Sequence, residues 1–148
     1  YLPPVMELLQ RLTRKQLEVL ERVARLAGPG PGVPLNRLAR SLRVSSPTAL
    51  AHLTVLERWG LVVRARGKTG LSPRGRTTLG EYVRHHRVAE ALFAQIGLSS
   101  PETCRAAREI DLALGHATVD LLCRAAGHPS ACPHGAPIPP CVGEVRGR

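Results

Sequence analysis

The chain has 148 residues, a formal net charge of +10 and only 3% aromatic residues. This length suits one small domain or two closely joined domains, and it argues against a large catalytic α/β core. Lys and Arg outnumber Asp and Glu by 16 to 5 over residues 1–88, whereas residues 89–148 hold 5 against 6. The positive charge is therefore local, and it predicts a front half that binds a polyanion and a rear half with another task.

Two helices are expected before the first glycine-rich break. Residues 5–12 have amphipathic spacing and would form either a dimer contact or a cover for the core. Thr13 is a helix N-cap type, and the apolar positions that follow predict a helix as far as Ala27. The Gly-Pro-Gly-Pro-Gly run at residues 28–32 ends this helix.

Residues 33–60 have the pattern of a helix-turn-helix. Apolar residues recur every three or four positions between Pro34 and Leu42, which predicts a short first helix. Ser46 followed by Pro47 predicts an N-cap and the first residue of a second helix, which Gly60 ends. The expected inward-facing residues of this second helix are Leu50, Leu53, Val55 or Leu56, and Trp59.

A basic β-hairpin is expected next. Residues 61–63 form an apolar strand, residues 64–70 a basic, glycine-rich turn, and residues 71–72 a return strand. Helix-turn-helix and hairpin together form a winged helix-turn-helix, which predicts binding to double-stranded DNA. The candidate DNA contacts are Arg37, Ser45, Ser46, Pro47, Thr48, His52, Arg64, Arg66 and Lys68.

The rear half is expected to be helical. Ser72 and Pro73 open a long helix that runs to about Ile96. Shorter helices follow over residues 102–114, after Pro101, and over residues 117–126. With so few aromatic residues, this part must pack through Leu, Val and Ala, as small helical dimerisation units do.

These elements predict a mainly α fold, in which a winged helix-turn-helix DNA-binding domain is joined by a long linking helix to a small helical dimerisation domain. The expected parts are an N-terminal extension (1–12), the DNA-binding domain (13–76), the linking helix with the dimerisation and metal-sensing domain (77–126), and a Cys/Pro/Gly-rich loop (127–148). No apolar run of 18 residues and no signal-peptide pattern is present, so we expect a cytoplasmic protein with no membrane partner. No grouping typical of a catalytic triad or a phosphate-binding loop is visible, so we expect no enzyme.

Four stretches resemble the diphtheria toxin repressor and manganese transport regulator family of metal-dependent transcriptional repressors. They are Val44-Ser45-Ser46-Pro47-Thr48, Leu71-Ser72-Pro73-Arg74-Gly75, Arg84-His85-His86-Arg87-Val88-Ala89-Glu90 and Cys132-Pro133-His134-Gly135-Ala136-Pro137-Ile138-Pro139. The resemblance covers roughly residues 13–140. It implies a homodimer whose two recognition helices enter successive major grooves of a pseudo-palindromic operator.

The resemblance also implies metal ligands. His86 and Glu90 match ligand positions of the family, and their spacing of four puts both on one helix face. Cys104 matches a position that supplies a further ligand to the same ion. The divalent ion expected there is Fe²⁺ or Mn²⁺, although Zn²⁺ also accepts such ligands.

A second family site looks incomplete. Arg108 and Leu112 fall where ligands are expected, as do Lys15 or Gln16, and only Asp111 could still bind an ion. Arg108 would place a fixed cation beside that ion. A shift of one residue in the alignment would bring in Glu109 instead.

The cysteines leave a rival interpretation open. Cys104, Cys123, Cys132 and Cys141 could converge on a tetrahedral Zn²⁺ site or an iron–sulfur cluster, although their spacing matches no compact motif. Three functions thus remain. The first is a metal-responsive repressor of metal-homeostasis genes, the second is a winged-helix regulator sensing iron or redox state, and the third is a DNA-binding protein that ignores metal.

Overall fold

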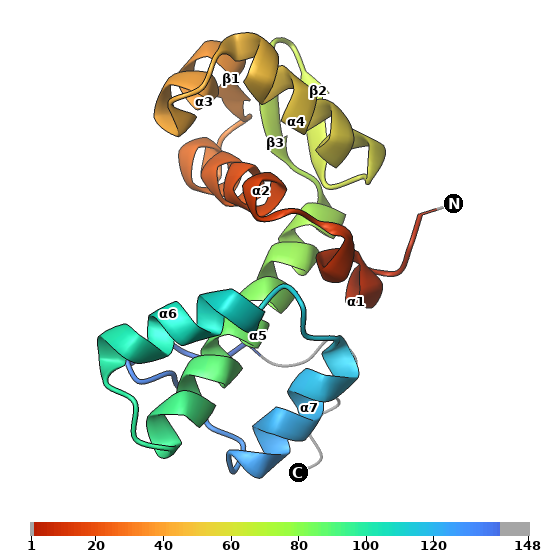
Figure 1. Ribbon diagram of the computed structural model, residues 1–148. Helices are drawn as coiled ribbons and strands as arrows, with labels where there is room; N and C mark the ends of the chain where they lie inside the picture. Colours follow the sequence, from red (N-terminus) through yellow and green to blue (C-terminus); the bar gives the residue numbers. More distant parts are fainter. Residues whose placement is uncertain (1, 140–148) are drawn as a thin grey trace. The chain divides into compact units, whose positions relative to one another are not determined.

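The computed structural model describes residues 2–139 and divides into two compact units (Figure 1). Among the described residues, unit 1 holds 2–5 and 12–79, and unit 2 holds 6–11 and 80–139. The elements are α1 (Val5–Leu8), the 3₁₀ helix η1 (Leu9–Arg11), α2 (Arg14–Ala27), β1 (Val33–Pro34), α3 (Leu35–Leu42), α4 (Ser46–Arg58), β2 (Val62–Ala65), β3 (Lys68–Leu71), α5 (Pro73–Gln95), α6 (Ser100–Ile110) and α7 (His116–Ala125). The prediction of a mainly α chain is confirmed, and a small sheet accompanies the helices.

The start of α2 follows directly from its sequence. Thr13 Oγ1 accepts a hydrogen bond from the Gln16 amide (3.1 Å), and Gln16 Oε1 accepts one from the Thr13 amide (3.0 Å). This capping box satisfies two backbone donors that a helix start otherwise leaves unpaired. The predicted cap at Thr13 is confirmed. The single helix predicted over residues 5–12 is wrong in form, because one α turn is followed by a 3₁₀ turn.

Helix α4 begins one residue earlier than predicted. Ser45, not Ser46, is its N-cap, since the Ser45 side chain accepts the Thr48 amide at 3.2 Å and its carbonyl accepts the Ala49 amide at 3.0 Å. The buried face consists of Ala49, Leu53 and Leu56. Leu50 was expected inside but is 39% exposed, because it lies one residue, or about 100°, around the helix from Ala49.

The hairpin is tighter than predicted. Strands β2 and β3 are antiparallel, and their pairing continues to Ala65 opposite Lys68. Only Arg66 and Gly67 form the turn, with φ of 53° and 73°. Two positive φ values in a two-residue turn match the twist of the flanking strands. The strand pairing therefore includes residues that the sequence analysis placed in a turn over residues 64–70.

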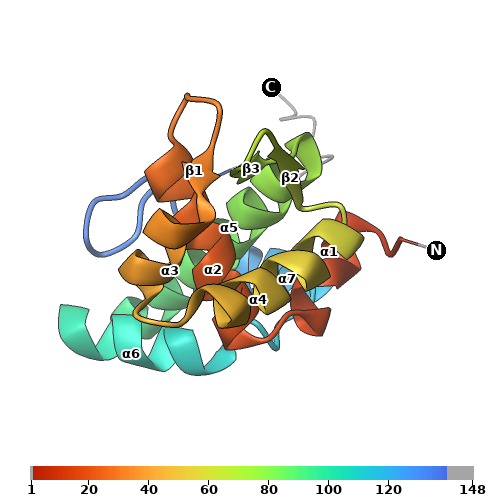
Figure 2. The ribbon, with the colours of Figure 1, turned by 90° about the horizontal axis from the view of Figure 1, so that it is seen from above.

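A third strand was not predicted. Strand β1 pairs antiparallel with β3, with Val33 opposite Thr69, and gives the sheet order β1-β3-β2 (Figure 2). Two residues are too few to show the alternation that marks a strand in a sequence. Within unit 1, α2 contacts the sheet and both α3 and α4, while α4 also contacts β2.

Helix α5 begins where predicted. Ser72 Oγ accepts the Gly75 amide at 2.9 Å, and the Ser72 carbonyl accepts the Arg76 amide at 3.0 Å. A Cβ on Gly75 would lie 2.0 Å from the Leu61 carbonyl oxygen, so this close contact of the first helical turn requires glycine.

The helices of unit 2 include the later turns of α5 together with α6 and α7, and residues 6–11 also belong to this unit. The predicted starts of the second and third rear helices lie too far along the chain. Ser99 caps α6 by a capping box with Glu102, and α7 already begins at His116. Val88 of α5 packs with Val119 and Cys123 of α7, and Leu114, Leu122 and Ile138 border this core. Within residues 2–139, no helix is both long and apolar enough to cross a membrane.

Candidate metal centre

Helix α5 presents two ligand-type side chains at a spacing of four residues. His86 Nε2 lies 3.3 Å from Glu90 Oε1. The Glu90 side chain is only 4% exposed, and His86 is 18% exposed, so solvent reaches the pair mainly from the histidine side. This is the face that the spacing in the sequence predicted.

Helix α6 brings the third predicted residue to the same place. Cys104 Sγ lies 3.8 Å from His86 Nε2, and the ligand atoms of His86, Glu90 and Cys104 are all within 4.8 Å of one another. One imidazole nitrogen, one carboxylate oxygen and one sulfur atom could therefore reach a single ion.

Asp111 has a different position from the one expected of a second-site ligand. Its Oδ2 lies 2.9 Å from His86 Nδ1 and accepts a hydrogen bond of 2.9 Å from the Tyr82 hydroxyl, and the residue is fully buried. A carboxylate on one imidazole nitrogen orients the ring and directs the other nitrogen to a metal. Asp111 is thus a positioning residue for His86.

The segment after α7 adds two donors that the sequence did not assign to this ion. His134 Nδ1 lies 3.4 Å from Glu90 Oε1, and Glu90, Cys132 and His134 form a second group of ligand atoms within 4.8 Å. A turn holds Cys132, whose amide donates to the Ala136 carbonyl while its carbonyl accepts the Gly135 amide. Because Glu90 belongs to both groups, we treat His86, Glu90, Cys104, Cys132 and His134 as one thiol centre.

The electrostatics of the thiol centre favour a cation. Burial raises the pKa of the Cys104 thiol, and the carboxylates of Glu90 and Asp111 raise it further, while Arg108 opposes them. The thiolate therefore forms most readily when a positive ion offsets these carboxylates. Imidazole, carboxylate and thiolate together are a donor set for iron or zinc, and the carboxylate is the part that manganese prefers.

The predicted four-cysteine site is not formed by the described cysteines. Cys123 packs in the core of unit 2, and its sulfur lies 3.8 Å from His128 Nδ1. Within residues 2–139, none of the ligand groups includes Cys123. The apolar face of α7 holds this thiol against Val88 and Val119, away from Cys104 and Cys132, and Cys141 lies outside the described residues.

The candidate DNA contacts all belong to unit 1. All of them except His52, which is half-buried, are exposed: Arg37, Ser45, Ser46, Pro47, Thr48, Arg64, Arg66 and Lys68. Arg64 lies in β2 rather than at the tip of the hairpin, and its guanidinium binds Glu57 Oε2 of α4 at 2.7 and 2.8 Å. Arg66 lies in the turn of the hairpin, and Lys68 is the first residue of β3 after it.

Comparison with known proteins agrees with this chemistry. Residues 72–140 match the family described as iron dependent repressor, metal binding and dimerisation domain. This segment contains every residue of the thiol centre. Over these residues the chain is therefore similar to the metal-binding and dimerisation domain of iron-dependent repressors, which supports the resemblance to the diphtheria toxin repressor family.

Solved structures of similar fold match most of this chain. A hypothetical protein of Sulfolobus solfataricus is 28% identical, with a TM-score of 0.83 over 87% of this chain and 100% of that one. IdeR of T. acidophilum is 25% identical, with a TM-score of 0.64 over 93% and 64%. A manganese-dependent transcriptional repressor in complex with manganese is 27% identical, with a TM-score of 0.68 over 90% and 62%.

The chain thus spans slightly less than two thirds of IdeR and of the manganese-dependent repressor. No curated protein matches the sequence. The manganese named for the manganese-dependent repressor is a property of that protein.

Proposed function

We propose that this chain belongs to the diphtheria toxin repressor family, that it is a homodimeric, metal-responsive transcriptional repressor of metal-homeostasis genes, and that the thiol centre is its sensor. The observation that carries the proposal is the convergence of His86, Glu90 and Cys104, with Asp111 orienting His86 from behind. The matched description, metal binding and dimerisation, supports the same role for residues 72–140.

The donor chemistry favours Fe²⁺ over Mn²⁺. Two of the five residues in the thiol centre are cysteines, and thiolates are softer donors than the oxygen ligands that suit manganese. Loss of the Cys104 proton on binding would add a charge that a divalent ion stabilises strongly. We therefore propose Fe²⁺ as the ion to which the protein responds.

Unit 1 supplies the DNA-binding surface in this proposal. The exposed N-terminal residues of α4 would approach the major groove, and Arg66 and Lys68 of the hairpin would contact phosphates. Each phosphate that the protein neutralises makes the slope of log affinity against log salt concentration steeper by about 0.9, so DNA binding should weaken steeply as salt rises. We propose that the protein acts by binding DNA and not as an enzyme.

Metal and DNA binding are linked in this proposal through α5. This helix begins in unit 1 and carries His86 and Glu90 in unit 2. A bound ion would join α5 to α6 and to the segment around Cys132, and would favour whichever arrangement of these elements binds it more tightly. DNA affinity then changes by the same coupling free energy.

The test uses duplexes selected from a random library by the Fe²⁺-loaded protein without oxygen. We expect chelation to weaken binding to the selected duplex by about 5- to 150-fold, the usual range of allosteric coupling. His86→Ala should abolish this response, whereas His128→Ala, a histidine of the same unit outside the thiol centre, should keep it. Equal affinity with and without Fe²⁺, or a full response in His86→Ala, would refute the proposal.

A further inference from the structure

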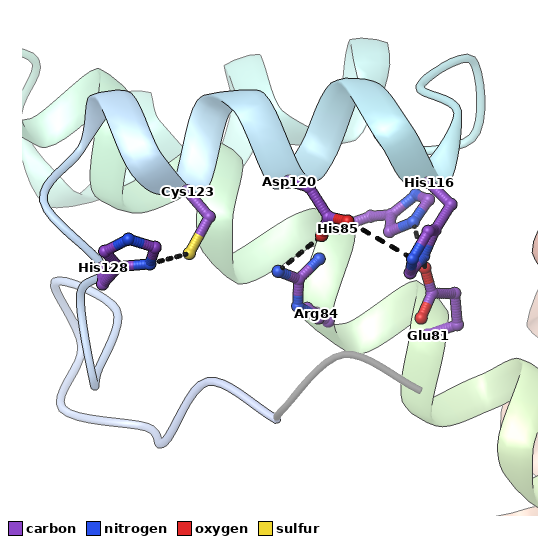
Figure 3. A network of polar contacts seen from close by, with 7 residues as sticks. All are labelled: Glu81, Arg84, His85, His116, Asp120, Cys123 and His128. Carbon is purple, nitrogen blue, oxygen red and sulfur yellow. Dashed lines mark hydrogen bonds and ion pairs between the residues drawn. The ribbon is translucent and has the colours of Figure 1, made fainter. Parts of the chain in front are cut away.

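A second group of ligand-type side chains lies between α5 and α7, apart from the thiol centre (Figure 3). Glu81 Oε1 lies 2.8 Å from His85 Nε2 and 2.5 Å from His116 Nδ1. We call Glu81, His85 and His116 the α5–α7 group. The Glu81 and His85 side chains are 1% and 0% exposed, and His116 is 21% exposed.

Two atoms of this group are buried without a hydrogen-bond partner. They are Glu81 Oε2 and His85 Nδ1, for which no partner is found among the described residues. A buried polar atom left unpaired is costly, and native proteins have few of them. An unpaired carboxylate oxygen beside two imidazoles is a ready ligand for an ion.

Asp120 supports the group from behind. Its Oδ2 lies 3.4 Å from His116 Nε2, on the opposite side of the ring from Glu81. Its Oδ1 is bound to Arg84 at 3.0 Å, so the Asp120 carboxylate stands between Arg84 and the α5–α7 group (Figure 3). This is the carboxylate–histidine arrangement that directs the other imidazole nitrogen, here Nδ1, to a metal.

We propose that Glu81, His85 and His116 bind a second divalent transition ion of the zinc type, independently of the thiol centre. Two imidazoles and one carboxylate are a common ligand set for Zn²⁺, and a water molecule would complete the tetrahedron. The ion takes the place of the protons that His85 Nε2 and His116 Nδ1 share with Glu81. Each neutral ring then carries its proton on the other nitrogen, which in His116 is the Nε2 that faces Asp120. Zinc–ligand bonds of about 2.0–2.2 Å require the three donor atoms to move slightly further apart than they now lie.

The two sites remain separate because of helix geometry. His85 and His86 are consecutive, so their side chains leave α5 about 100° apart. Glu81 of α5 contacts both His85 of the same helix and His116 of α7, whereas His86 contacts Cys104 of α6. The second ion would fasten α7 to α5 within unit 2, whereas the thiol centre involves α6 and the segment after α7.

The test titrates Zn²⁺ into the His86→Ala protein, in which the thiol centre lacks its histidine. His116→Ala added to this background should remove one equivalent of bound Zn²⁺ per chain and the rise in melting temperature that Zn²⁺ produces. His128→Ala in the same background is the matched control and should remove neither. Glu81→Gln, similar in shape to the original side chain, should weaken the same equivalent if His116→Ala disturbs folding.

Cobalt distinguishes the two sites by their donors. Co²⁺ bound to the thiol centre should show sulfur-to-metal charge transfer, and Co²⁺ in the α5–α7 group should show only the weaker d–d absorption of a site with nitrogen and oxygen ligands. Cys104→Ser with Cys132→Ser should remove the first spectrum and leave the second. Identical Zn²⁺ stoichiometry with and without His116, or loss of both spectra in the serine protein, would overturn the proposal.

Discussion

The thiol centre and the α5–α7 group use neighbouring residues of one helix but differ in chemistry and in exposure. The thiol centre contains two cysteines and reaches solvent at His134, which is 45% exposed. The α5–α7 group has no sulfur, and its Glu81 and His85 side chains are fully buried, while His116 is 21% exposed. Solvent access at the thiol centre favours exchange of a bound ion, whereas the burial of Glu81 and His85 favours slow exchange in the α5–α7 group.

The largest expected effect on metal affinity comes from replacing each of the two supporting carboxylates by an amide. Asp111→Asn should weaken metal binding at the thiol centre by about 10- to 100-fold, because the amide no longer orients His86 as the carboxylate does. Asp120→Asn should act in the same way on the α5–α7 group. Competition titrations with a coloured chelator measure both. If each variant affected both sites equally, the two would form one cooperative site.

A pH titration of metal affinity should also separate the sites. The raised pKa of Cys104 means that its proton must leave when the ion binds, so affinity at the thiol centre should rise about tenfold per pH unit near neutrality. Cys104→Ser should flatten this dependence. Calorimetry in buffers of different ionisation enthalpy counts the released protons. A slope unchanged by the substitution would show that Cys104 is not a ligand.

The smallest expected effect concerns the metal-free protein in acid. Burial by itself would raise the pKa of Glu81, but hydrogen bonds and charge from His85 and His116 outweigh it and hold the pKa at about 2, below the ordinary 4.5. The stability contributed by this lowered pKa is complete above pH 4.5 and is lost as pH falls towards 2.

The slope of the free energy of unfolding in that interval should therefore be smaller in Glu81→Gln, by at most about 1.4 kcal/mol per pH unit. Denaturant melts at a series of acidic pH values measure it. Parallel curves for the two proteins would contradict the lowered pKa.

Local signals in the sequence were enough to predict where α2 and α5 begin. Thr13 and Ser72 cap their helices through contacts within a few residues, so nothing distant has to be known. The same reasoning missed by one residue at Ser45, because two adjacent serines precede Pro47 and either could cap.

The ligand groups were predictable only as far as helix spacing reaches. His86 and Glu90 share a face by their spacing alone, and a family resemblance was needed to add Cys104. His116 is separated from Glu81 by 35 positions, and His134 joins Glu90 only because the chain after α7 returns to α5. Side-chain packing between helices brings these pairs together, and no local pattern encodes it.

The two-residue turn of the hairpin has a consequence for how DNA would be held. Arg66 adopts a left-handed backbone conformation that costs a side-chain-bearing residue about 1–2 kcal/mol, and Gly67 follows it without strain. Because the strand pairing continues up to this short turn, the turn has few alternative conformations before it contacts a phosphate. The hairpin that carries Arg66 and Lys68 is therefore preorganised. Binding to a DNA duplex would cost it little conformational entropy, which raises the affinity.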